Sequence, residues 1–262
     1  MPDNINIIIL FLAHKGVMQP EWWNKWKNAS EEYKNNIIFR VHAPLNPEHG
    51  EKFCNDNTIG FYDEQTKWCR PSLVKVYFSC LKSIMIEFPA NSLIYLVSGY
   101  DIPIRPSRYM FQDKYEIYNT ETKIFDPKTY NHKLSRICKV NDTQSHQWLA
   151  LSSDDANKIY YNYENNFQKY IDMWYIDRKG CPDETFITNI INIINLKYDV
   201  KCTTIDYRSN CNDPSPIEWN DLDEEKYIYI LNKKKCIKST LRKIIYHENM
   251  TSHNFFYEKN KP

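Results

Sequence analysis

The sequence predicts an α/β fold in which a mostly parallel sheet is flanked by helices. Three segments, at residues 5–13, 36–42 and 92–98, have the pattern of strands, and the first is a continuous apolar run typical of a strand buried on both faces. Helical segments separate them, one opening at Pro20 and the other at Pro71. This alternation implies right-handed crossovers between parallel strands. Ligands of such sheets bind beyond the carboxyl ends of the strands, so we expect a site at that edge.

Length and composition narrow the function classes. The chain has 262 residues and shows no repeat or low-complexity linker, so a single domain over 1–262 is expected. A net charge of +1 gives no reason to expect attraction to nucleic acid or a membrane surface. Only 5 glycines are present, and neither GxGxxG nor GxxxxGK[ST] occurs, which argues against a glycine-rich phosphate loop.

The chain is expected to be soluble and cytoplasmic. No segment reaches the roughly 18 apolar residues of a membrane span, and residues 5–13 fit a first strand better than a signal peptide. The 8 cysteines form no CxxC pair and show no zinc-finger spacing with histidines, so we expect mostly free thiols. Disulfides would require an oxidising compartment.

Less regular segments complete the prediction. The first helix is expected to run to about residue 33 and the second to about 88, with a polar loop at 45–66 between the strand and the second helix. A strand at 147–152 precedes a helix over about 154–163 that Ser153 can cap. Strand and turn are expected over 114–126, further strands at 202–207 and 227–231, and a basic helix or extended arm at 238–247.

The most informative motif is Cys181-Pro182-Asp183-Glu184-Thr185-Phe186, which opens an apolar run predicted to be helical to about residue 194. Proline suits the first turn of a helix, and acidic side chains there meet the positive end of its dipole. The pair of carboxylates is therefore either an ordinary helix start or a candidate general base held at a fixed position.

The order of motifs along most of the chain resembles the core-2/I-branching N-acetylglucosaminyltransferases, together with the related xylosyltransferases and plant homologues. L-V-S-G-Y-D-I-P-I at 96–104 is similar to the family's G-x-D-F-P-I, and C-P-D-E at 181–184 is similar to its P-D-E. The other matching segments are residues 19–23, 39–44, 68–74, 145–148, 203–208, 213–216 and 239–244. The chain departs from the pattern at Lys75, Tyr207 and Ser215.

The resemblance implies a GT-A-like fold and an inverting glycosyltransferase. The donor would be a UDP-sugar, with GlcNAc or xylose as the transferred sugar and a glycan or protein hydroxyl as the acceptor. It implies a donor-binding half over about 1–110 and an acceptor and catalytic half over about 111–262. Glu184 would be the general base, and Asp183 would orient the loop or the acceptor.

The leaving diphosphate needs its developing charge neutralised. The resemblance implies that basic residues do this without a metal, and Lys243 and Arg242 match best, with Arg208 as a further candidate. Asp221-Leu222-Asp223 is a metal-binding type of triplet, but it lies in an acidic segment that follows no strand at the expected edge. We interpret it as a solvated turn, so no metal or other cofactor is expected.

Other polar side chains complete the predicted site. His14 and Lys15 follow the first strand and His42 ends the second, where the donor nucleotide is expected, although a lone histidine is as often structural. Ser72 is a further donor-site candidate, or it caps its helix. Asp101 and Trp148 are candidates for sugar contacts, with a turn and core packing as their alternatives.

Two other functions stay open at this stage. A non-catalytic carbohydrate- or nucleotide-binding module could keep the fold and lack turnover. A nucleic-acid-binding protein could use the basic C-terminal segment, but the near-neutral charge disfavours it. No GxSxG nucleophile elbow and no HExxH metal motif occurs.

Overall fold

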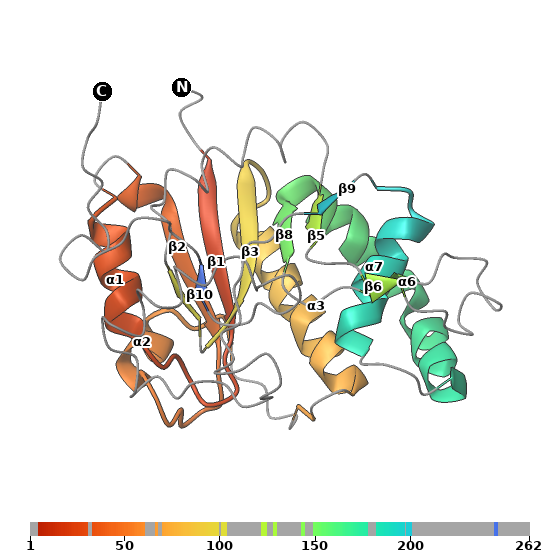
Figure 1. Ribbon diagram of the computed structural model, residues 1–262, viewed down its shortest axis with the longest axis horizontal. Coiled ribbons are helices and arrows are strands. Elements are labelled where there is room, and N and C mark those ends of the chain that lie inside the picture. The colour runs from red at the N-terminus through yellow and green to blue at the C-terminus, as the bar shows by residue number, and fades with distance from the viewer. Residues whose placement is uncertain are drawn as a thin grey trace.

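The structure, a computed structural model, places a mixed sheet between layers of helices (Figure 1). It describes residues 5–30, 33–60, 66–67, 70–99, 101–103, 122–124, 128–129, 143–144, 149–177, 182–196, 198–200 and 244–245. The sheet has the strand order β2-β1-β3-β8-β5-β9. This confirms the α/β class, with helices on both faces of a sheet.

The first part of the sheet follows the predicted strand–helix alternation. β1 (Asn6–Leu12) lies between β2 (Ile37–His42) and β3 (Ser92–Ser98), and both pairings are parallel. α1 (Pro20–Asn28) leads from β1 towards β2, and α3 (Pro71–Glu87) leads from β2 to β3. Both helices begin at a proline, as predicted.

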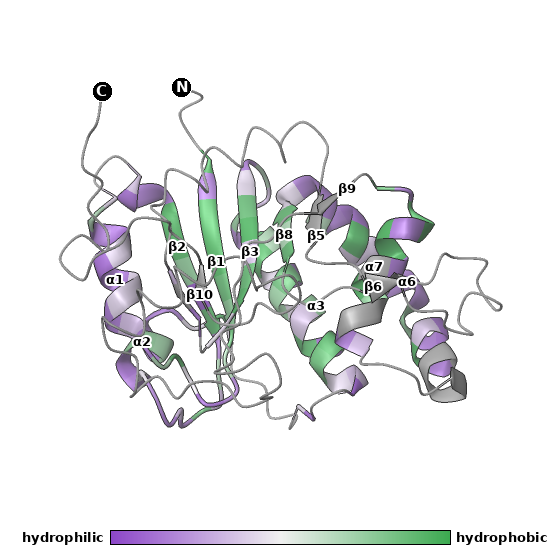
Figure 2. Cartoon of the chain, in the orientation of Figure 1, coloured by the Kyte–Doolittle hydropathy of each residue, from purple (hydrophilic) through white to green (hydrophobic). Residues whose placement is uncertain are grey.

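Alternate residues of β1 enter two different cores. Ile8 and Leu10 belong to the core that also holds the apolar residues of α3. Phe11, on the opposite face, contacts Trp23 of α1 with ring centroids 4.9 Å apart and Phe39 of β2 at 6.1 Å. Successive side chains of a strand point to opposite faces, so burial on both explains the continuous apolar run. Figure 2 shows hydrophobic residues along β1, β2 and β3.

The second part of the sheet departs from a purely parallel arrangement. β8 (Leu149–Ser152) runs antiparallel to β3 and to β5 (Thr122–Ile124), whereas β9 (Tyr198–Val200) is parallel to β5. The sheet is therefore mixed, with β8 the strand that opposes the others. A short apolar strand carries no local signal of its direction, which is why its sequence could not predict this.

Two helices of the second part cover α3. α6 (Ser153–Asp177) and α7 (Pro182–Ile193) pack against α3 and against each other. Tyr163 of α6 stacks on Phe78 of α3 with centroids 3.7 Å apart. α7 begins at Pro182, as the acidic motif predicted.

Four local predictions needed correction. The helix expected over 154–163 runs to Asp177, because apolar residues continue at helical spacing, at Tyr163, Phe167, Tyr170 and Ile171. Its cap is Ser152, whose hydroxyl accepts the N–H of Asp155 at 3.1 Å, whereas the hydroxyl of Ser153 accepts the N–H of Ser92.

The predicted loop at 45–66 contains a helix, α2 (Glu51–Asp56), which buries Phe53 and Cys54. Less than two turns of mostly polar sequence give too little periodicity to be recognised. The first helix ends at Asn28 rather than near residue 33, and a 3-10 turn, η1 (Lys34–Asn36), precedes β2.

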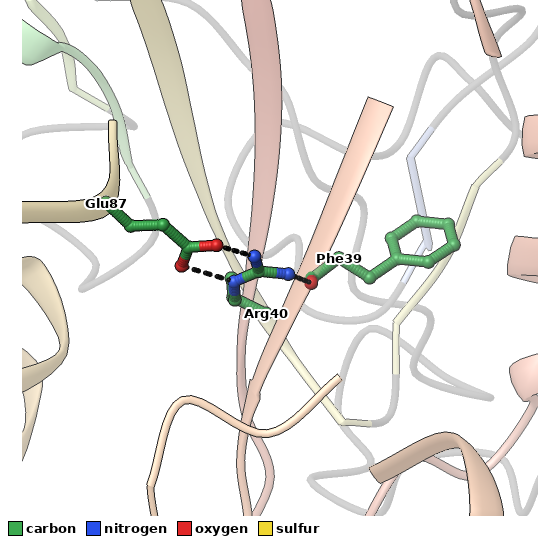
Figure 3. Close-up of polar contacts among 3 residues, drawn as sticks. All are labelled: Phe39, Arg40 and Glu87. Carbon is green, nitrogen blue, oxygen red and sulfur yellow. Dashed lines mark hydrogen bonds and ion pairs between the residues drawn. The ribbon is translucent and has the colours of Figure 1, made fainter. Parts of the chain in front are cut away.

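The outer edge of β2 is covered locally. Val41 exchanges backbone hydrogen bonds with the segment 57–59, donating to Asn57 O at 2.8 Å. Arg40 donates to Phe39 O at 2.7 Å and forms a two-armed ion pair with Glu87 at the end of α3, as Figure 3 shows. These contacts occupy edge groups that could otherwise pair with another strand.

Short pairings connect distant parts of the chain. β4 (Ile102–Pro103) pairs in parallel with β10 (Ile244–Ile245), and β6 (Lys128–Thr129) pairs antiparallel with β7 (Thr143–Gln144). β10 lies in the segment expected to be a basic helix or arm, and its pairing favours the extended form there. Of the helices described, none has the length and apolarity that a membrane crossing needs.

Candidate functional site

Three loops meet at the carboxyl edge of β1, β2 and β3. The N–H of Met18 donates to Gly99 O at 2.8 Å, and the N–H of His49 donates to Lys15 O at 3.0 Å. A Cβ on Gly16 would lie 2.0 Å from His49 O, and one on Gly99 would lie 2.3 Å from Gly16 O. Glycine is required at both positions, since the loops contact backbone to backbone. The contacts give a rigid frame at the expected edge.

Lys15 and Glu48 form an ion pair on this frame. Lys15 Nζ lies 3.0 Å from Glu48 Oε2, and both side chains are exposed. The hydrogen bond from Lys15 lowers the pKa of Glu48 most, with further contributions from the charges of Lys15, His49 and His14. The carboxylate is therefore ionised at neutral pH. His14 is exposed beside this pair.

His42 ends β2 and is half-buried. Its Nδ1 lies 3.2 Å from Gly60 O. A carbonyl can only accept, so Nδ1 carries the hydrogen and Nε2 is left as an acceptor. Burial lowers the pKa of His42, and the Gly60 contact opposes this only in part, so the ring is neutral at pH 7.

Asp101 follows β3 and is 1% exposed. Its Oδ2 accepts the N–H of Ser98 at 2.6 Å, and its backbone carbonyl accepts the indole N–H of Trp23 at 2.8 Å. These contacts give Asp101 a structural role in the turn after β3. Contact of Asp101 with a sugar stays a prediction, and it would require this side chain to become accessible.

Ser72 stands at the second residue of α3. Its hydroxyl accepts the N–H of Lys67, which precedes the helix, at 3.1 Å. The hydroxyl therefore fixes the loop that enters α3 rather than capping a helical N–H. α3 connects β2 to the parallel β3, so it begins at the same carboxyl edge.

The first turn of α7 also lies at this edge. β8 ends at the opposite edge because it is antiparallel to β3. α6 then leads from that edge back to the carboxyl edge of β1, β2 and β3. α7 begins there and leads away to the start of β9, which is parallel to β5. Figure 1 shows α7 and α3 beginning at the end of the sheet where β1 stops. Asp183 is half-buried there, with one carboxylate oxygen enclosed. Glu184 belongs to the same turn, and its side chain lies outside the described part of the structure.

The chain returns to this edge close to its C-terminus. Ile244, which follows Lys243 directly, pairs with Ile102, which follows Asp101 directly. Four predicted site residues lie outside the described residues, namely Trp148, Arg208, Arg242 and Lys243. The Asp221 and Asp223 pair lies outside them as well.

Within the described ranges, no three His, Cys, Asp or Glu side chains are grouped so that they could hold a metal ion. Cys54 and Cys80 are free and buried. Burial raises the pKa of Cys54 and raises that of Cys80 to about 12, so both thiols stay protonated at neutral pH.

Sequence reasoning missed two contributors to this edge. Glu48 lies in a polar segment without a motif, and only the fold brings it to Lys15 across 33 positions. Trp23 belongs to the segment 19–23, for which the sequence predicts only a helix start, yet its indole N–H donates to the carbonyl of Asp101. Neither contact has a local signal in the sequence.

No protein-family model matches the chain, and no curated protein matches it significantly. The family resemblance described above therefore stays a prediction.

Proposed function

We propose that the protein is an inverting, metal-independent glycosyltransferase that moves a monosaccharide from a UDP-sugar to a glycan or protein hydroxyl. The observation that carries the proposal is the convergence of separate segments at one edge of the sheet. The ends of β1 and β2 bring His14, Lys15 and His42, and α7 brings Asp183 and Glu184 in its first turn. Open α/β sheets bind their ligands at this edge.

The proposed reaction is a single displacement. The carboxylate of Glu184 takes the proton of the acceptor hydroxyl while that oxygen attacks the anomeric carbon of the donor sugar. The bond from this carbon to the diphosphate oxygen breaks, and UDP leaves with the electron pair. Attack from the face opposite the diphosphate inverts the anomeric configuration.

Charge on the leaving diphosphate has to be neutralised as it develops. Lys243 and Arg242 are assigned this role, with Arg208 as a further contributor. What supports the assignment is the β4–β10 pairing, because the residue after Lys243 pairs with the residue after Asp101. An arginine can contact a phosphate with two parallel hydrogen bonds, whereas a lysine supplies a point charge.

The test is a UDP-release assay over a panel of UDP-sugars and acceptors in EDTA. Wild-type protein should release UDP with one donor, and Glu184→Gln should lower kcat at least about a hundredfold, which is the usual range for loss of a general base. Glu21→Gln is the matched control, because Glu21 is also a first-turn acid beside a proline. It should leave turnover unchanged.

Three outcomes would change the proposal. Unchanged turnover in Glu184→Gln would remove Glu184 as the base. Release that requires Mn²⁺ would overturn the metal-independent mechanism and return attention to Asp221 and Asp223. Binding of a UDP-sugar without turnover over the whole panel would favour the non-catalytic binding module.

A further inference from the structure

We propose that Glu48, held by Lys15, binds a vicinal diol, and that this diol is the ribose of the donor nucleotide. The inference rests on the proposed function, since that function supplies the nucleotide. It adds a binding residue from a segment in which the sequence shows no motif. The position, the rigid backbone and the charge of the Lys15–Glu48 pair all favour such a ligand.

Lys15 and Glu48 lie where a nucleotide is expected to bind. Lys15 lies three residues after the end of β1, and Glu48 lies in the segment that follows β2, so both stand beyond the carboxyl ends of adjacent parallel strands. In dinucleotide-binding sheets an acidic side chain beyond the second strand accepts hydrogen bonds from the ribose. Glu48 occupies the corresponding region here. Asp101, by contrast, is enclosed and committed to the turn after β3.

Rigidity distinguishes this ion pair from an ordinary surface pair. Exposed pairs usually contribute little, because two long side chains must be ordered to form them. Here the backbones that carry the two residues are already joined. His49 N–H donates to Lys15 O at 3.0 Å, and Gly16 contacts His49 so closely that no side chain fits between them. The backbones of both residues are thus fixed before a ligand arrives, and the contact with Lys15 orients the carboxylate, so less ordering remains to be done on binding.

Charge then selects the ligand. The lysine and the carboxylate neutralise each other, so the pair has little net attraction for a phosphate. An ionised carboxylate accepts hydrogen bonds only, and its two oxygens present several acceptor positions, so adjacent hydroxyls are suitable donors. Both side chains are exposed, with 44% and 59% of their surfaces accessible, so a ligand can reach Glu48 while Lys15 still contacts it.

A vicinal diol could come from the ribose of the donor or from a sugar of the acceptor. The position beyond β1 and β2 favours the ribose. Calorimetric titration with UDP and with 2′,3′-dideoxy-UDP separates the two sources, because only the first nucleotide carries the ribose hydroxyls.

We expect wild-type protein to bind UDP at least about tenfold more tightly than dideoxy-UDP, as the loss of hydrogen bonds to a charged group implies. Glu48→Gln should lose a similar factor for UDP and almost nothing for dideoxy-UDP. Lys15→Met should reduce the same preference in part, since Lys15 acts by positioning the carboxylate. General structural damage would weaken the binding of both nucleotides equally.

Asp56→Asn is the matched control. Asp56 also carries an exposed carboxylate paired with a lysine, with Lys52 Nζ at 2.6 Å and 57% of the side chain accessible, but it belongs to α2. This variant should keep the wild-type preference for UDP.

The outcomes separate the two proposals. If wild-type protein binds UDP and Glu48→Gln loses affinity for both nucleotides alike, or for neither, the ribose role of Glu48 is wrong and the transferase proposal stands. If Glu48→Gln instead weakens the binding of the acceptor alone, the diol belongs to the acceptor, and our assignment is overturned. Wild-type protein that binds no UDP would overturn both proposals.

Discussion

The parallel region of β1, β2 and β3 and the helical region of α6 and α7 present their functional groups in different ways. In the parallel region the groups stand on loops, and direct backbone contacts at Gly16 and Gly99 fix these loops. In the helical region Asp183 and Glu184 stand in the first turn of a helix, whose position depends on side-chain packing against α3. A substitution in the parallel region should therefore lower the free energy of unfolding more than a substitution of similar size in the helical region.

The largest expected difference is in the loss of stability when one buried aromatic ring is removed from each region. Trp23 is fully buried among Phe11, Trp26 and Phe39, and its indole N–H donates a hydrogen bond to Asp101 O. Trp23→Ala should lower the free energy of unfolding by about 5 kcal/mol, the upper end for such truncations, since it also removes a hydrogen bond to a buried carbonyl. Urea denaturation followed by far-UV circular dichroism measures this.

The partner variant in the helical region is Tyr163→Ala. Tyr163 stacks on Phe78 and contacts Phe167, so its ring packs between helices rather than against a turn of the sheet edge. Its loss should cost about 3 kcal/mol, the lower end of the same range. A cost for Tyr163→Ala equal to that of Trp23→Ala would contradict the distinction between the regions.

Much of the fold could be predicted because some segments carry strong local signals. The strand at 92–98 was predicted with the observed bounds, and Pro71 and Pro182 marked the starts of α3 and α7. Signals were absent where structure depends on distant contacts. The direction of β8 is set by its pairing with β3 and β5, and the length of α6 by packing on α3.

The candidate site was predictable only in part, for the same reason. The positions of His14, Lys15 and His42 follow from strand order alone, because the ends of parallel strands meet at one edge. The burial of Asp101 and the contact of Glu48 with Lys15 depend on how loops fold over that edge. Loop packing of this kind has no periodicity that a sequence could reveal.

Gly99 gives a second, smaller test of the backbone frame. A Cβ there would lie 2.3 Å from Gly16 O and 2.8 Å from Ala13 Cβ, so the loops after β1 and β3 must separate. Gly99→Ala should cost about 2 kcal/mol, typical of adding a methyl group to a site with no room. The same urea experiment measures it.

Ser83→Ala is the control for Gly99→Ala. Ser83 is exposed on α3, where its hydroxyl donates to the carbonyl of Ser79, so its replacement should stay within about 0.5 kcal/mol of wild type. If Gly99→Ala were equally neutral, the backbone contacts would not hold the loops rigidly together. The backbone that carries Glu48 would then not be fixed either.

The smallest expected effect is the pH dependence that His42 gives to the parallel region. Burial lowers the pKa of His42 in the folded protein, whereas the unfolded chain titrates near the ordinary value of about 6.5. The unfolded chain therefore binds more protons below that pH, and stability falls as the pH decreases from about 7 to 5. No histidine lies between His146 and His247, so β8, α6 and α7 add no histidine titration of their own.

His42→Asn isolates this contribution. The asparagine amide can still donate towards Gly60 O, as Nδ1 of His42 does at 3.2 Å, but it does not titrate. Unfolding midpoints in urea, measured from pH 5 to pH 8, should fall less steeply with acid in the variant than in wild type. Equal slopes would mean that His42 is accessible and titrates as it does in the unfolded chain. His42 would then contribute to the carboxyl edge as a solvated side chain, and the rigid frame would be limited to the loops that Gly16 and Gly99 join.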